Sequence, residues 1–256
     1  SNLLVSTRPN TGKFKVKAEW MPTTKPVEYS QYLKNNPDVI GIDLLIADLN
    51  GVLRGKRIQP GALGKVFKEG ICLPASVFAL DITGTTIEET GLGVESGDSD
   101  RICLHIPGTL TNIPWQKKPK GQLLLTMVEA DHQPFFADPR QVLRRVIEQF
   151  KDLRLTPVIA VELEFYLLDK RRDRNKNPQP PISPTSGKRE NNTQVYSIND
   201  LDDYDEFLET VTKGASIQGI PAYTAFRTSR TRAKSSLDVG ALHPNHVPAQ
   251  SQASPS

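Results

Sequence analysis

Two glutamates share one strand-like segment near the middle of the chain. Glu162 and Glu164 alternate with the apolar residues Val161, Leu163 and Phe165. Because side chains of a β-strand alternate between its faces, both carboxylates are expected on the same face. Neighbouring carboxylates repel one another, and a hard divalent cation such as Mg²⁺ removes that repulsion by taking oxygen ligands. The spacing therefore fits a metal site, and it fits equally well a surface strand with two solvated glutamates.

The composition is that of an ordinary globular protein. The 256 residues suffice for one large or two modest domains, with 37% hydrophobic residues, 24% charged residues and a formal net charge of +3. No basic stripe with interleaved aromatic residues is present, so nucleic acid is not an expected partner. No apolar stretch is long enough to span a bilayer. These features predict a cytoplasmic protein with no membrane or nucleic-acid partner.

The first half of the chain reads as a small mixed sheet domain. Residues 1–27 show no periodicity and are predicted to form an N-terminal arm, and residues 28–136 the sheet domain. Apolar residues alternate from Val39 to Ala47, and Asn50-Gly51 is a strong hairpin signal. A short helix is expected over residues 63–68, followed by Gly70, and a further strand over residues 122–129.

The second half begins with a helix-start signal. Asp138 is placed to cap a helix, Pro139 suits its first position, and Gln141 could complete a capping box. Another helix is expected over residues 201–218. Residues 137–225 are predicted to form the first part of a second domain. Residues 226–256 are rich in Ser, Arg, Ala and Pro, a composition that predicts a disordered tail.

Five stretches of the chain carry motifs of one enzyme family: Ile42–Arg57, Glu69–Asp100, Asp138–Arg140, Val161–Asp169 and Val195–Ser197. They resemble the N-terminal half of the glutamine synthetase family, and within it the γ-glutamyl-amine ligases. The resemblance implies an α+β protein: a β-grasp N-terminal domain, then an incomplete catalytic domain with an antiparallel sheet and flanking helices. It also implies ring-shaped homo-oligomers whose active sites are shared between subunits.

The resemblance assigns roles to individual residues. In this family ATP phosphorylates the γ-carboxylate of glutamate, and an amine then displaces the phosphate. By resemblance, Glu164 would bind the Mg²⁺ or Mn²⁺ ion nearer the glutamate, and Glu162 the ion among the ATP phosphates. Tyr196 falls where the family has a tyrosine beside the amine pocket, although a packing role is equally compatible. No catalytic or nucleotide-binding residue is identified with certainty.

Two departures from the family pattern carry information. Ammonia-using members have Asp-Gly-Ser-Ser where this chain has residues 74–77 (Pro-Ala-Ser-Val), which removes a carboxylate and favours a larger amine over ammonia. Nearby acidic residues could attract a polyamine or simply solvate their loop: Asp81, Glu88, Glu89, Asp98 and Asp100.

The second departure follows Ala225, where the metal-binding glutamates of the family are replaced by residues 226–230 (Phe-Arg-Thr-Ser-Arg). We expect a disrupted reading frame there, a tail that is not native, and little activity of this chain alone. Three functions remain open: a glutamate–amine ligase, a glutamine synthetase using ammonia, and a non-catalytic oligomeric binding protein. The sequence identifies neither the amine nor the true N-terminus.

Overall fold

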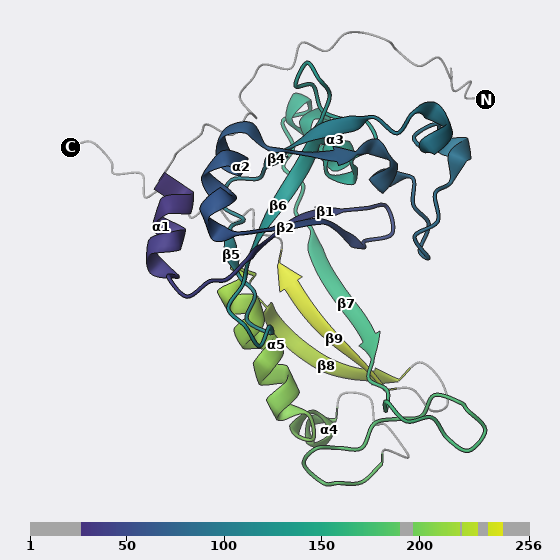
Figure 1. The fold of residues 1–256 in the computed structure, drawn as a ribbon. Helices are drawn as coiled ribbons and strands as arrows, with labels where there is room; N and C mark the ends of the chain where they lie inside the picture. Colours follow the sequence, from purple (N-terminus) through teal and green to yellow (C-terminus); the bar gives the residue numbers. More distant parts are fainter. Residues whose placement is uncertain (1–26, 190–196, 221, 230–234, 243–256) are drawn as a thin grey trace. The chain divides into compact units, whose positions relative to one another are not determined.

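The computed structural model describes residues 27–189, 197–220, 222–229 and 235–242. The described residues form two compact units (Figure 1). The first contains residues 27–37, 42–110 and 123–143, and the second contains residues 38–41, 111–122 and the described residues from 144 onward. The predicted domain boundaries at 27/28, 136/137 and 225/226 stay predictions.

The larger sheet has six strands in the order β2-β1-β6-β4-β3, with β5 paired to β6. Strand β1 is antiparallel to β2, β3 to β4, and β4 to β6. Helices and strands predicted around residues 63–68 and 122–129 are found within a residue or two of those positions. The strands are β1 (Ile42–Ala47), β2 (Leu53–Ile58), β3 (Ile71–Pro74), β4 (Asp100–His105), β5 (Thr111–Asn112) and β6 (Gly121–Val128).

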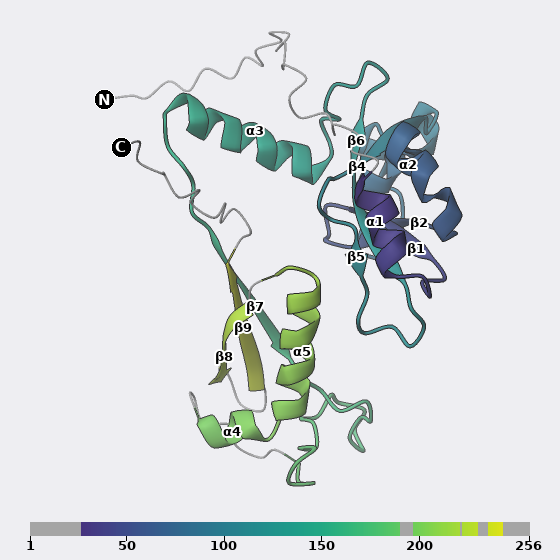
Figure 2. The same ribbon diagram turned by 90° about the vertical axis from the view of Figure 1, so that its left-hand side faces the viewer.

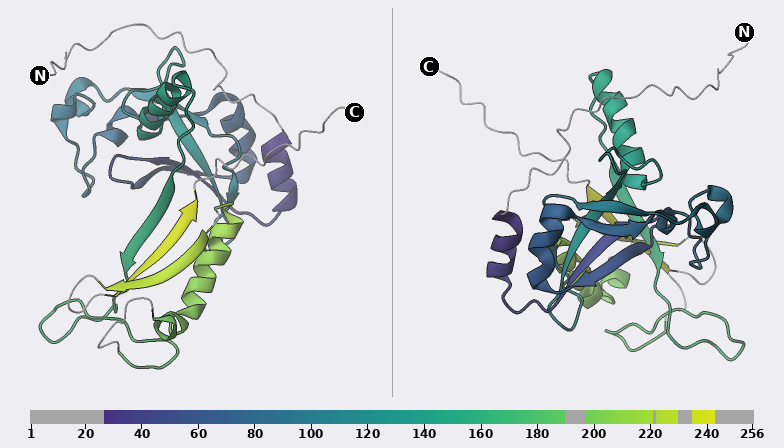
Figure 3. Two further views of the ribbon diagram at one scale, coloured as in Figure 1. Left: turned by 180° about the vertical axis from the view of Figure 1, so that it is seen from behind. Right: turned by 45° about the horizontal axis from the view of Figure 1, so that its top comes forward.

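The alternation of apolar residues in β1 is confirmed and builds the core of the first unit. Ile42, Leu44 and Ile46 are buried, whereas Ala47 is exposed. Helix α1 (Val27–Asn35) lies beside α2 (Leu63–Glu69), as Figure 3 shows. Apolar residues of α2, β4 and β6 complete this core: Leu63, Val66, Phe67, Cys103, Leu123, Leu125 and Met127.

Two positions in the first unit require glycine for steric reasons. Gly70 ends α2 with φ 73°, a left-handed conformation in which a side chain is strained. At Gly55, with φ 151°, an added Cβ would lie 1.8 Å from the backbone oxygen of Leu44. Glycine at position 55 therefore permits β2 to pair closely with β1.

Helix α3 (Pro139–Asp152) begins as the sequence predicts, but without the capping box. Asp138 Oδ1 accepts a hydrogen bond from the Arg140 N–H at 2.9 Å. Its Oδ2 accepts from the Thr126 hydroxyl and the Met127 N–H, at 2.7 and 2.8 Å. Gln141 donates to Thr126 Oγ1 instead of closing a box with Asp138. The capping residue thus joins the helix to β6.

The second unit contains a three-stranded antiparallel sheet in the order β7-β9-β8. Its strands are β7 (Ala160–Tyr166), β8 (Ala222–Ser229) and β9 (Ser235–Leu242). The structure differs here from the predicted disordered tail, because residues 226–229 and 235–242 are in strands. Main-chain hydrogen bonds between strands require no particular side-chain composition, so composition alone does not reveal such pairing.

Two helices follow β7 in the second unit: α4 (Ile198–Asp202) and α5 (Asp205–Ile217). Figure 2 shows α5 lying along the small sheet. The C-terminal end of α5 holds the β5–β6 connection, since Gln218 Nε2 donates to the Asn112 carbonyl at 2.6 Å and Gln122 Nε2 donates to Gln218 Oε1 at 2.7 Å. No helix in the described part of the chain is long and apolar enough to cross a membrane.

Candidate functional site

Glu162 and Glu164 both lie in strand β7, as predicted. The backbone of β7 is described at these positions, and their side chains lie outside the described structure. Residues two apart on a strand belong to the same face. The backbone therefore agrees with the arrangement that a shared cation requires, and the roles of both glutamates stay predictions.

The pairing of β7 with β9 brings a further acidic residue into register. Glu164 pairs with Asp238, and Glu162 pairs with Gly240. Directly opposed residues of an antiparallel pair share a face of the sheet, and like charges in such positions destabilise the pair. A cation bound at this face would remove the penalty. The register thus adds Asp238 to the acidic positions around Glu164.

The opposite face of β7 packs against helix α5. The ring of Phe165 lies 6.1 Å from that of Phe207, in an edge-to-face arrangement. Since successive positions alternate, 162 and 164 belong to the face that does not contain Phe165. Tyr166 also belongs to that second face, and its side chain is exposed.

The other predicted binding residue cannot be compared with the structure. Tyr196 lies outside the described residues. Among the side chains that are described, no group of three His, Cys, Asp or Glu residues is placed to hold a metal ion. The side chains of Glu162 and Glu164 are not part of that set.

The segment that replaces the family's Asp-Gly-Ser-Ser folds inward. Residues 75–78 form a 3-10 helix in which Ala75, Ser76 and Phe78 are buried. The Ser76 N–H donates to Asp98 Oδ1 at 3.2 Å. Most of the apolar side chains of this segment therefore pack into the core. A carboxylate does approach the segment, from Asp98.

Acidic residues in the following loop are largely engaged in the loop's own hydrogen bonds. Asp81 Oδ1 accepts from the Thr83 hydroxyl at 2.7 Å and from the Thr83 and Thr85 N–H groups at 2.8 and 2.9 Å. These bonds lower the pKa of the Asp81 carboxyl. Glu88 accepts from the N–H groups of Val94 and Glu95. Asp81 and Glu88 thus shape the loop, and the exposed acids from Asp81 to Asp100 are Glu89, Glu95 and Asp100.

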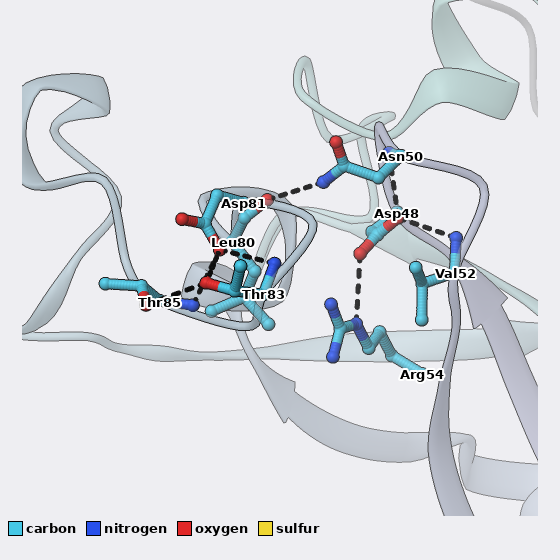
Figure 4. A network of polar contacts seen from close by, with 8 residues as sticks. All are labelled: Asp48, Asn50, Val52, Arg54, Leu80, Asp81, Thr83 and Thr85. Carbon is cyan, nitrogen blue, oxygen red and sulfur yellow. Dashed lines mark hydrogen bonds and ion pairs between the residues drawn. The ribbon is translucent and has the colours of Figure 1, made fainter. Parts of the chain in front are cut away.

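A polar network connects this loop to the β1–β2 turn (Figure 4). Asp48 accepts from the Asn50 and Val52 N–H groups at 2.8 Å each, and from Arg54 Nε at 3.0 Å. Asn50 Nδ2 reaches across to the Leu80 carbonyl at 2.8 Å. The Asn50-Gly51 pair is thus at the predicted turn, and its asparagine also holds a loop that is distant in sequence.

Asp48 is the buried centre of this network. Burial raises the pKa of the Asp48 carboxyl, but the hydrogen bonds from Val52, Arg54 and Asn50 together outweigh burial and place the pKa below its ordinary value. Asp48 therefore stays ionised and neutralises Arg54. The sequence analysis did not identify Asp48 as a functional or structural residue. Its position two residues before the Asn50-Gly51 turn was the signal that could have found it.

Other basic residues of β2 are also engaged. Arg57 forms a two-bond ion pair with Asp43, and Lys56 Nζ donates to the Cys72 carbonyl at 2.9 Å. Cys72 and Cys103 are both free thiols; Cys72 is exposed and Cys103 is buried. Burial raises the pKa of the Cys103 thiol to about 12, which makes it an unreactive core residue.

The comparisons with known proteins agree with the motifs. A family model described as "Glutamine synthetase, catalytic domain" matches residues 136–236. This range extends past Ala225, beyond the point where the motifs predict a disruption. Gamma-glutamylputrescine synthetase PuuA of Escherichia coli (strain K12) is 45% identical over 195 residues, which cover 76% of this chain and 41% of that protein.

A glutamine synthetase of Pyrococcus abyssi (strain GE5 / Orsay) is 31% identical over 129 residues, covering 50% of this chain and 26% of that protein. The chain thus spans less than half the length of these relatives. A crystal structure of a "novel glutamine synthase homolog" superimposes with a TM-score of 0.59 at 15% identity, over 80% of this chain and 43% of the other. The described residues therefore adopt a glutamine-synthetase-like fold, and the chain is a relative of the glutamine synthetase family, as its motifs predict.

Proposed function

We propose that this chain is part of an ATP-dependent ligase that joins an amine to the γ-carboxylate of glutamate. The observation that carries the proposal is the catalytic-domain match, because residues 136–236 include strand β7 with Glu162 and Glu164. The 45% identity to a γ-glutamylputrescine synthetase supports an amine as the acceptor. An ATP-dependent enzyme needs a nucleotide pool, so the proposal includes a cytoplasmic location.

Glu162 and Glu164 are the residues proposed to hold Mg²⁺ or Mn²⁺. Carboxylate oxygens are the ligands that such hard cations prefer. When bound, the ions would neutralise charge on the ATP phosphates during phosphoryl transfer. Positions 162 and 164 share one face of β7, and Asp238 is paired with Glu164 on the neighbouring strand. A cation bound there would relieve the repulsion between these acidic residues. Tyr196 is proposed to lie beside the amine.

The larger sheet is proposed to be the β-grasp domain of this family. Its hairpin β1–β2, helix α2 and central strand pair β1–β6 support that assignment. In the proposed assembly, rings of subunits would share each active site between neighbours. The polar network around Asp48 would then keep the β1–β2 turn and the loop of residues 80–85 in fixed positions.

An amine larger than ammonia is the favoured acceptor, and a glutamine synthetase using ammonia is the second candidate. The segment of residues 74–77 contains no carboxylate for an ammonium ion, which favours the amine. Asp98 lies against Ser76, however, and could supply a carboxylate nearby, which keeps ammonia as the alternative.

The metal step is tested by titrating Mn²⁺ into the purified chain and following the electron paramagnetic resonance signal of free Mn²⁺. We expect weak binding, because two or three carboxylates supply only part of a divalent-ion coordination shell. Glu162→Gln and Glu164→Gln should each abolish it. Glu209→Gln is the matched control, since Glu209 is an exposed glutamate paired with Lys213. Binding that is unchanged in both β7 variants would refute the metal assignment.

The reaction is tested by measuring phosphate release from ATP with glutamate and either putrescine or ammonium. For this chain alone we expect little or no turnover. Turnover that requires putrescine, and that the Glu164→Gln change abolishes, would support the ligase while contradicting the expected inactivity. Turnover with ammonium in preference to putrescine would favour a glutamine synthetase.

A further inference from the structure

The central strand of the small sheet, β9, alternates between apolar residues and small or acidic residues. Its apolar positions pair with the apolar positions of β7: Leu237 with Phe165, Val239 with Leu163, and Ala241 with Val161. Because successive residues of a strand belong to opposite faces, these positions share one face of the sheet. This is the face on which the Phe165 ring packs against Phe207 of helix α5.

The other face of the same strands collects acidic positions. Figure 1 shows β9 between β7 and β8. Asp238 of β9 pairs with Glu164 of β7, and the neighbouring pair on this face is Gly240 with Glu162. On its other side Asp238 pairs with Phe226 of β8, which supplies no charge. Three acidic positions therefore lie next to one another on this face.

The strands themselves offer these acids no balancing cation. Within β7, β8 and β9, as the structure describes them, the one basic residue is Arg227. Its register partner is Leu237, so Arg227 belongs to the apolar face and not to the face of Asp238. Like charges at directly opposed positions destabilise a strand pair. A cation from outside these strands would remove that cost.

The apolar pairing fixes the register that places Asp238 beside Glu164. Side chains repeat with a period of two along a strand, so a one-residue slip would move every residue of β9 to the opposite face. Asp238 would then belong to the apolar face, and Val239 to the acidic one. The cost of exposing apolar side chains opposes that slip, although the slip would separate Asp238 from Glu164.

Carboxylates at these three positions are within reach of one ion. The Cβ atoms of directly opposed residues such as Glu164 and Asp238 are roughly 5 Å apart, and diagonal neighbours such as Glu162 and Asp238 about 7–8 Å. A glutamate carboxylate is two bonds beyond its Cβ, so oxygens from such neighbouring positions can meet at a single ion. Donors that are all carboxylates suit Mg²⁺ or Mn²⁺ rather than metals that prefer sulfur or imidazole.

We propose that Asp238 is a further ligand of the divalent ion held by Glu164. The inference rests on the metal role of β7 proposed above, and it adds a residue outside the family match, which ends at residue 236. None of the matching motifs contains Asp238, and residues 226–230 lack the glutamates expected there. Strand β9 thus contributes a third carboxylate to the site, from a position that the family pattern does not assign.

Binding of Mn²⁺ to the purified chain, followed by the electron paramagnetic resonance signal of free Mn²⁺, tests the inference. Asp238→Asn keeps the size of the side chain and removes its charge. It should raise the dissociation constant at least about tenfold, since losing even a residue that only supports a ligand commonly costs about 10–100-fold in metal affinity. Asp202→Asn makes the same chemical change at an exposed position of α4 and should bind Mn²⁺ like the wild type.

Stability with and without the ion separates a ligand from a residue that only supports the fold. In EDTA, Asp238→Asn should have a higher urea midpoint than the wild type, because it removes a like charge opposite Glu164. With saturating Mn²⁺ the wild type should gain stability, and the variant should gain less. A purely structural aspartate would instead give a lower midpoint for the variant under both conditions, and that result would overturn the proposal.

The variants also distinguish this inference from the proposed function. If Asp238→Asn binds Mn²⁺ as the wild type does and Glu164→Gln does not bind it, Asp238 is not a ligand and the metal role of Glu164 is retained. If neither variant changes binding, or if the wild type binds no Mn²⁺ at roughly millimolar concentration, the weak end of protein sites for divalent ions, both are overturned.

Discussion

Replacing Asp138 by alanine is expected to lower the free energy of unfolding by about 3 kcal/mol. Losing the helix cap at the Arg140 N–H costs about 1 kcal/mol. The Met127 N–H is then left without its acceptor inside the core, which costs roughly 2 kcal/mol more. Thr126 Oγ1 still accepts from Gln141, but its own hydroxyl hydrogen also loses a buried acceptor, so the loss is at least this large.

Urea denaturation followed by circular dichroism measures the effect. Asp138→Asn should lie between wild type and alanine, because one acceptor oxygen remains. Asp152→Ala is the matched control: it removes an exposed carboxylate from the last position of the same helix, and should change the stability by less than about 0.5 kcal/mol. If Asp138→Ala costs no more than the control, the buried hydrogen bonds do not connect α3 to β6 as described.

Three further predictions concern stability. The folded-state pKa of Asp48 is lowered, so its ionised carboxylate stabilises the fold at neutral pH, and this stabilisation is lost as the pH falls below about 4. In urea denaturation from pH 6 to pH 3, the midpoint of Asp48→Asn should therefore fall less with decreasing pH than that of the wild type. Burial lowers the pKa of His105, so the unfolded chain binds more protons than the folded chain below about pH 6.5, and the stability falls there. His105→Phe, which places a second aromatic ring beside the stacked Phe67, should flatten the dependence of the urea midpoint on pH between 7 and 5. Gly214→Ala should raise the stability by about 0.5–1 kcal/mol in thermal denaturation, because alanine favours the helical conformation of α5 more than glycine does. The added Cβ would lie 3.7 Å from Pro114, an ordinary contact distance. A loss of stability would contradict this reasoning.

Local signals predicted much of the first unit. The alternation in β1, the turn at Asn50-Gly51 and the cap at Asp138 each involve residues within a few positions of one another, and the structure contains all three. The family was likewise recognised from short motifs. Reasoning from neighbouring residues alone also explains why the predicted capping box was wrong. Gln141 was expected to serve Asp138, but Thr126, from a strand fifteen residues earlier, offered a buried partner.

Contacts between distant segments could not be read from the pattern. Asn50 reaches Leu80, and Ser183 reaches Asp203, through positions that only folding brings together. Strand β9 was missed because its composition is that of a tail. The helical spacing of apolar residues in α3 does not show whether they are covered: Val142, Leu143 and Val146 are each more than 40% exposed.

By itself the sequence determined the relationship to glutamine synthetases, the elements that place Glu162 and Glu164 on one strand, and the caps and turns that begin and end those elements. These follow from residue type and short spacing. The tertiary structure decided which charges are buried and paired, as at Asp48 with Arg54, and which are exposed, as at Glu89. It also decided that Asp238 lies opposite Glu164. Ion pairing and strand register depend on distances between segments far apart in the chain, and a linear sequence contains no such distances.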